Sequence, residues 1–118
     1  DMVRVPLPEY RANLIEIIRQ CRATGAEVIL STPNATTDNA VRPTQLLLEY
    51  CDVIRAVAAE YQVTLCDTYQ AFTALRDRDE LEWRLTMSDA IHPNLAGHQF
   101  IAAQLAGSIV GHPVSLTL

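Results

Sequence analysis

The chain has no lysine, and this absence bears on the partners that it can bind. Its basic residues are arginines scattered along 118 residues, and the formal net charge is −5. It therefore lacks the basic stripe that is typical of nucleic-acid binding. No apolar run reaches the roughly 18 to 20 residues that a membrane-spanning helix needs. We expect neither nucleic-acid binding nor a membrane span.

A targeting signal is also missing from the visible N-terminus. Residues 1–6 show no signal-peptide pattern, and the chain does not begin like a natural translation start. We therefore expect that upstream sequence is missing, and both a cytoplasmic and a secreted location stay open.

Metal-binding and redox patterns are equally scarce. The three cysteines form no Cys-x-x-Cys pair, and each falls inside an apolar element, which favours small, reduced, buried side chains (Cys21, Cys51 and Cys66). A zinc site built from Asp89, His92 and His98 is conceivable, but it lacks the His-x-x-x-His spacing that places two ligands on one helix face. We expect no metal and no cofactor.

The serines lack the sequence context of a nucleophile. None of them stands in a Gly-x-Ser-x-Gly elbow or a Gly-Asp-Ser turn (Ser31, Ser88, Ser108 and Ser115). Ser31 ends an expected strand, Ser88 adjoins an Asp-His pair, and Ser108 falls inside an expected helix. The sequence therefore predicts that the chain has no nucleophile of its own.

What the chain does have is an alternation of amphipathic helices and short apolar strands. Hydrophobic spacing predicts helices over residues 8–24, 44–61, 68–76 and 95–110, and strands over residues 26–32 and 63–66. Residues 33–43 read as a polar loop, and residues 77–86 as a charged, less regular segment. The 49% hydrophobic content is typical of a folded domain rather than a disordered chain.

This order predicts an α/β fold with a parallel sheet and right-handed crossovers. Two strands, however, cannot shelter four or five amphipathic helices, and one strand edge would stay open. We therefore expect the chain to be part of a larger sheet, whose other strands lie upstream or on another chain.

The sharpest candidate for chemistry is the segment from Ser88 to Asn94. It places Asp89 three residues before His92, so the carboxylate can hold one ring nitrogen while the other takes a proton from a nucleophile. The alternative is that Asp89 only caps the following segment and His92 is an ordinary polar residue before Pro93. The loop over residues 33–43 is a candidate substrate wall, because ligands bind beyond the carboxyl ends of parallel strands. It could equally be an ordinary surface connection.

The residues around this pair carry a family likeness. Residues 88–98, Ser-Asp-Ala-Ile-His-Pro-Asn-Leu-Ala-Gly-His, resemble the C-terminal block of the SGNH hydrolases, the GDSL-type esterases and lipases. Residues 10–14 and 25–33 resemble the family's helix and fourth strand, and residues 63–67 its fifth strand. The resemblance implies a three-layer α/β/α, flavodoxin-like parallel sheet. Residues 1–118 would be the C-terminal part of a single domain that lacks its N-terminal strands and nucleophile block.

The same resemblance implies ester hydrolysis, of acyl or acetyl esters, by a Ser-His-Asp mechanism. His92 would be the general base and Asp89 its orienting partner. The family's serine and its oxyanion glycine and asparagine belong to blocks that these residues lack, although Asp1 is placed where it could end the Gly-x-Asn-Asp block.

The implied partners are a small ester substrate and a segment or chain that completes the sheet. The chain alone is expected to be inactive. The alternative is a catalytically inactive binding or interaction module that pairs through its open sheet edge.

Overall fold

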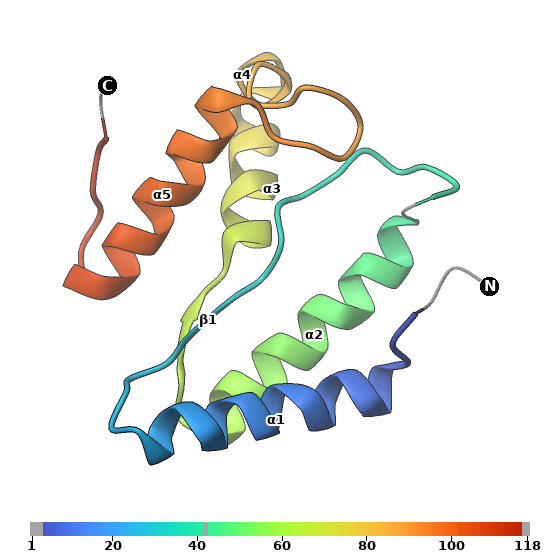
Figure 1. Cartoon of the computed structure of the whole chain (residues 1–118). Helices are drawn as coiled ribbons and strands as arrows, with labels where there is room; N and C mark the ends of the chain where they lie inside the picture. Colours follow the sequence, from blue (N-terminus) through green and yellow to red (C-terminus); the bar gives the residue numbers. More distant parts are fainter. Residues whose placement is uncertain (1–3, 42, 117–118) are drawn as a thin grey trace.

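The computed structural model describes residues 4–41 and 43–116, in which five helices alternate with two short strands. In chain order these elements are α1 (Leu7–Ala23), β1 (Ile29–Ser31), α2 (Thr44–Glu60), β2 (Thr64–Cys66), α3 (Thr68–Arg78), α4 (Glu80–Arg84) and α5 (Leu95–Val110) (Figure 1). The expected helices and strands are all present, and both strands are shorter than expected. Asp1 lies outside the described residues.

Local sequence signals set the helix boundaries in the second half of the chain. Asp67, Asp79 and Asn94 each cap a helix, since their side chains accept a backbone N–H from the first turn of α3, α4 and α5 respectively. The segment expected to be irregular therefore contains a short helix, α4, because Asp79 ends α3 and begins the next helix. Gly111 ends α5 with a φ of 79°, a left-handed conformation that favours glycine.

The two strands form a parallel sheet with helices on both sides. Leu30 of β1 lies opposite Leu65 of β2 in the register. Figure 1 shows α1 and α2 on one side of the strands, and α5 contacts β2 from the other side. The α/β class with a parallel sheet is confirmed. Within the described residues each strand pairs only with the other, so the outer edges have no strand partner.

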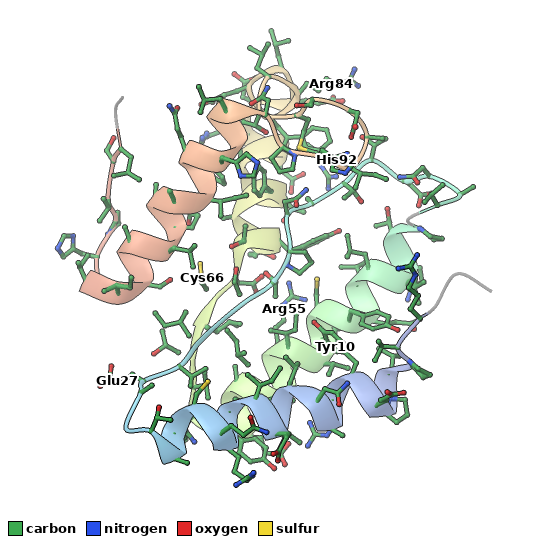
Figure 2. The ribbon with its side chains drawn as sticks, viewed as in Figure 1. Tyr10, Glu27, Arg55, Cys66, Arg84 and His92 are labelled. Atoms are coloured by element: carbon green, nitrogen blue, oxygen red, sulfur yellow. The ribbon has the colours of Figure 1, made fainter. Side chains whose placement is uncertain are left out.

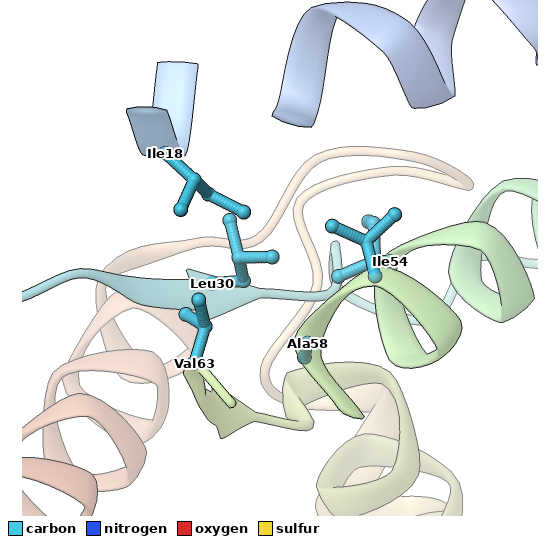
Figure 3. Close-up of a cluster of buried hydrophobic side chains, with 6 residues drawn as sticks. Ile18, Leu30, Ile54, Ala58 and Val63 are labelled. Carbon is cyan, nitrogen blue, oxygen red and sulfur yellow. The ribbon is translucent and has the colours of Figure 1, made fainter. Parts of the chain in front are cut away.

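The core divides into two clusters. The first packs α1 and α2 onto the strands (Ile18, Leu30, Ile54, Val57, Ala58 and Val63; Figure 3). The second joins α3 and α4 to α2 and to the loop after β1 (Ala35, Cys51, Tyr69, Phe72, Leu75 and Trp83). Phe72 also meets Phe100 of α5 edge-on, with ring centres 4.8 Å apart. The second cluster therefore packs together the two segments that follow the strands, namely the loop after β1 and the helix α3 after β2.

Two expectations about burial are only partly met. Cys51 and Cys66 are buried, whereas Cys21 is partly exposed, and all three are free thiols. The apolar face expected on α5 is also incompletely covered, because Ile101 and Leu105 are half-buried and Ile109 is 70% exposed. No described helix combines the length and apolar character that crossing a bilayer requires.

Candidate active site

Asp89 and His92 lie on one tight turn, and the carboxylate contacts the imidazole directly. Nδ1 of His92 is 2.8 Å from Oδ2 and 3.1 Å from Oδ1 of Asp89. Oδ1 also accepts the backbone N–H groups of Ile91 and His92, both at 2.7 Å. The carboxylate thus does both things that the sequence left open: it stabilises the turn and it holds the ring. The helix that follows is capped by Asn94 instead.

These hydrogen bonds determine the charge of Asp89. The N–H groups of His92 and Ile91, followed by the His92 side chain, lower the pKa of the Asp89 carboxyl to about 2. Asp89 is therefore ionised at neutral pH and can only accept hydrogen bonds, which favours the His92 tautomer that carries its proton on Nδ1. That arrangement leaves the lone pair of the imidazole on Nε2.

The imidazole is open to an incoming group. The His92 side chain is 72% exposed, and among residues 4–41 and 43–116 no hydrogen-bond partner contacts its Nε2. Figure 2 shows His92 on the loop before α5, at the same end of the molecule as Arg84. The ring can therefore exchange a proton with a hydroxyl group that approaches from outside.

The turn is closed at its base by backbone pairing. Met87 and Pro93 form an antiparallel bridge, and the N–H of Ser88 donates to the carbonyl of His92 at 2.8 Å. The N–H of Asn94 donates to the carbonyl of Thr86 at 2.9 Å. The Asp-His pair therefore projects from a small hairpin whose two ends meet at the start of α5.

Gly97 is what allows α5 to begin so close to this hairpin. A Cβ at this position would lie 2.3 Å from the carbonyl oxygen of Thr86 and 2.7 Å from the Cβ of Pro93. The close approach of helix and hairpin therefore requires glycine at position 97. The close packing of α5 against the hairpin therefore explains why the segment from Asp89 to His98 contains a glycine at position 97.

The loop after β1 holds the turn from a second side. The N–H of Thr37 donates to the carbonyl of Ala90 at 2.9 Å, and Nδ2 of Asn34 donates to the carbonyl of Ile91 at 3.0 Å. Sequence reasoning placed these residues in a polar loop but did not single them out. Their positions just after a buried strand were the only available signal.

A polar network fixes the carboxyl ends of the strands beneath this loop. Two guanidinium nitrogens of Arg55 donate to Asp67, at 2.8 and 3.1 Å, and the Thr32 hydroxyl donates to the same carboxylate at 2.8 Å. Thr32 Oγ1 in turn accepts the N–H of Tyr69 at 2.9 Å. Figure 2 shows Arg55 near the carboxyl ends of the strands. Sequence reasoning also missed this network.

The network keeps Asp67 ionised. Partial burial alone would raise the pKa of its carboxyl, but the hydrogen bonds from Arg55, Thr32 and the N–H of Gln70 outweigh that effect and lower it. The same contact raises the pKa of Arg55 further above its usual range. The loop that is hydrogen-bonded to the Asp-His turn therefore begins next to the ion pair of Arg55 and Asp67.

Among the described residues, no candidate serine side chain is hydrogen-bonded to the imidazole. The Ser31 hydroxyl bonds to Thr68 at the end of β1, and the Ser108 hydroxyl donates to the carbonyl of Gln104 within α5. His98 is exposed on α5. In the part of the chain that the structure describes, no cluster of three or more His, Cys, Asp or Glu side chains is arranged to hold a metal ion.

Part of the polar loop forms one wall of an open groove. Thr36, Thr37 and Asp38 line it from the loop, and Asp89 lines it from the turn. The loop expected to be a substrate wall therefore borders a hollow next to the Asp-His pair.

Solved structures of hydrolases have the same fold over about half of their length. An α/β hydrolase, LAE5, from the metagenome of Lake Arreo, Spain, is 32% identical with a TM-score of 0.70, and the match covers 88% of this chain and 47% of that one. A catalytic mutant of Axe2, an acetylxylan esterase from Geobacillus stearothermophilus, is 25% identical with a TM-score of 0.74, covering 96% and 51%.

A lipase/acylhydrolase from Enterococcus faecalis is 22% identical with a TM-score of 0.75, covering 98% and 57%, and shares the fold. The chain thus spans about half the length of the structures it matches. Comparison with curated proteins gives no match. The model of the GDSL-like Lipase/Acylhydrolase family matches residues 2–100, which is most of the chain. The chain therefore belongs to the GDSL-like lipase/acylhydrolase family.

Proposed function

We propose that the chain supplies the general base and its orienting carboxylate to a serine-dependent ester hydrolase. His92 is the base, and Asp89 fixes its tautomer and stabilises the imidazolium that forms when the ring takes a proton. The contact of 2.8 Å between Nδ1 of His92 and Oδ2 of Asp89 carries this proposal. Family membership and the esterases among the solved structures support hydrolysis of an acyl ester.

Each step of the reaction uses Nε2 of His92. A serine hydroxyl attacks the carbonyl carbon of the ester, and its proton passes to Nε2. The bond from that carbon to the alcohol oxygen then breaks, and His92 returns the proton to the leaving alcohol. Water attacks the acyl-serine ester by the same route, which releases the carboxylic acid and restores the serine.

The nucleophile of this proposal lies outside the 118 residues. None of the described serine side chains is hydrogen-bonded to His92. The unpaired edge of β1 and the exposed apolar side chains of α5 support a further segment, or another chain, that completes the sheet and brings the serine with its oxyanion donors. The matching structures are about twice as long as the matched region, which also supports this arrangement.

An assay with a short-chain aryl acetate tests the proposal. We expect that the chain alone neither turns over the ester nor is labelled by a fluorophosphonate, and that activity appears together with the segment bearing the serine. His92→Ala should then lower kcat/KM by roughly 10⁴-fold or more. His98→Ala, which changes an exposed histidine six residues further on, should leave the rate unchanged.

Two results would overturn the proposal. One is robust turnover by the chain alone that His92→Ala abolishes, since the nucleophile would then lie within it. The other is full activity of the completed enzyme after His92→Ala. If the completed sheet binds a partner but never hydrolyses an ester, the alternative of an inactive interaction module is favoured.

A further inference from the structure

Two neighbouring carbonyl groups of the Asp-His turn are held by the loop after β1. The Ala90 carbonyl accepts the backbone N–H of Thr37 at 2.9 Å, and the Ile91 carbonyl accepts Nδ2 of Asn34 at 3.0 Å. Any residue except proline can make the first bond, because the donor is a backbone group. The second bond needs the side chain at position 34. Of these two contacts, only the one from Asn34 therefore depends on the identity of a loop residue.

The peptide group between Ile91 and His92 is bound at both of its polar ends. Its carbonyl accepts the Asn34 amide, and its N–H donates to Oδ1 of Asp89 at 2.7 Å. A hydrogen bond to the carbonyl polarises a peptide group and makes its N–H a better donor. The Asn34 amide is thus linked through one peptide group to the carboxylate that holds Nδ1 of His92.

Asn34 is flanked by buried residues, whereas the pair that it supports is exposed. Thr32, two residues before it, is 2% exposed, and Ala35, directly after it, is fully buried. The side chains of Asp89 and His92 are 56% and 72% exposed. The Asp-His pair therefore gains little from side-chain packing, and hydrogen bonds to the turn determine its position.

A carboxamide suits the surroundings of Asn34 because its nitrogen carries two protons. Nδ2 donates to the carbonyl of Ile91 and also to the carbonyl of Ala35, at 3.1 Å. Each proton thus has an acceptor of its own. A hydroxyl group has a single proton, and an ionised carboxylate has none, so neither could bind both carbonyl groups.

From these contacts we propose that Asn34 is a positioning residue for the Asp-His pair. It acts by fixing the peptide group between Ile91 and His92 rather than by touching the reacting atoms. The inference rests on the proposed function in one respect, namely that His92 is the general base. The donor at position 34, and not the size of its side chain, then keeps the imidazole where a serine hydroxyl meets it.

Nuclear magnetic resonance of the folded chain tests this support without any catalysis. Asn34→Leu removes the amide and nearly keeps the size of the side chain. At neutral pH the backbone N–H proton of His92 should move upfield in this variant, because its hydrogen bond to Asp89 weakens. The midpoint of the Asp89 carboxyl titration should rise by on the order of half a pH unit for the same reason. A residue that only stabilises the folded chain would move neither signal.

The other charged groups that line the groove with Asp89 are the same in every variant (Asp38, Arg76, Glu80 and Arg84). A changed midpoint therefore reports the hydrogen bond. Asn34→Gln keeps the amide on a longer side chain and should give values between those of Asn34→Leu and the wild type. The matched control is Thr37→Ala, which shortens an exposed side chain of the same loop and keeps the backbone bond to Ala90. It should leave both signals unchanged.

Kinetics of the completed enzyme test the consequence for the reaction. Asn34→Leu should lower kcat roughly 10- to 100-fold, because a small displacement of a catalytic group can cost that much. KM should stay within about twofold of the wild type, since the amide is not proposed to bind the substrate. Asn34→Gln should recover most of the lost kcat.

Four outcomes would overturn the inference: unchanged His92 and Asp89 signals in Asn34→Leu, an equal change in Thr37→Ala, a wild-type kcat in Asn34→Leu, or failure of Asn34→Leu to fold. The last would mean that the amide holds the whole fold rather than the turn. Unchanged signals with an active esterase would remove only the role of Asn34. The expected signal changes without esterase activity would remove only the proposed reaction.

Discussion

A methyl group added at Gly97 should displace the turn that carries Asp89 and His92. An alanine Cβ would lie 2.3 Å from the Thr86 carbonyl oxygen and 2.7 Å from the Pro93 Cβ. Both atoms belong to the hairpin that the Met87–Pro93 bridge closes, so neither can move without displacing the hairpin. Over-packing of this kind costs typically about 3 kcal/mol, while alanine gains about 1 kcal/mol in helix propensity over glycine.

The net expectation for Gly97→Ala is a loss of about 2 kcal/mol in the free energy of unfolding. For a chain of this size that corresponds to a fall in Tm of roughly 8 °C, measured by circular dichroism. The matched control is Gly107→Ala in the same helix, where the nearest atom, the His112 carbonyl oxygen, is 3.1 Å away in an exposed segment. The exposed segment can give by a few tenths of an ångström, so the same propensity gain is offset only in part, and the unfolding free energy should match that of the wild type or exceed it by up to about 1 kcal/mol.

A Gly97→Ala variant with a Tm at or above that of the wild type would refute this reasoning. It would mean that α5 does not begin against the Thr86 carbonyl, and the position of the Asp-His turn relative to α5 would be wrong. If both variants were destabilised to the same extent, the loss could not be assigned to the contact of residue 97 with Thr86 and Pro93.

Three further predictions follow from the electrostatics and burial. Asp67→Asn should lower the unfolding free energy at pH 7 by about 2 kcal/mol. Because the folded pKa of Asp67 is lowered, its contribution is present above about pH 4 and is lost on acidification, so the unfolding free energies of the two proteins from urea titrations should converge as the pH falls below the usual range of an aspartate. The ¹³C signal of the Asp89 carboxyl should titrate near pH 2; a midpoint close to ~3.9 would contradict its hydrogen bonds. Burial raises the pKa of Cys51 to about 11, and Cys66 is buried as well. Ellman's reagent should therefore modify only Cys21 in the folded chain and all three thiols after denaturation. Three reactive thiols in the folded chain would contradict the packing.

The elements of this fold could be predicted because their sequence signals are local. An apolar run at Val28, Ile29 and Leu30 marks β1, and a polar loop follows it directly. The helix α4 was missed because its charged residues show no apolar period, although Asp79 followed by Glu82 was a usable capping signal. Local patterns therefore gave the order of the elements but not every helix.

The site could be predicted only where its residues are neighbours in the sequence. Asp89 and His92 are three residues apart, so one turn brings them together. The pair of Arg55 and Asp67 joins two helices, and the contact of Asn34 with Ile91 spans 57 residues. Such contacts depend on how elements pack, which spacing does not reveal. Likewise, only the packed structure shows that Thr36 Oγ1 and Trp83 Nε1 are buried without a hydrogen-bond partner among the described residues.

The tautomer of His92 tests the central claim most directly. Long-range ¹H–¹⁵N spectra of the chain, recorded on the neutral imidazole, should show the proton on Nδ1, facing Asp89. Asp89→Asn can keep the oxygen that accepts the N–H groups of Ile91 and His92, but it places an amide donor opposite Nδ1 and should move the proton to Nε2. A wild-type His92 that already carries its proton on Nε2, unchanged by Asp89→Asn, would contradict the assignment of this pair as base and orienting carboxylate.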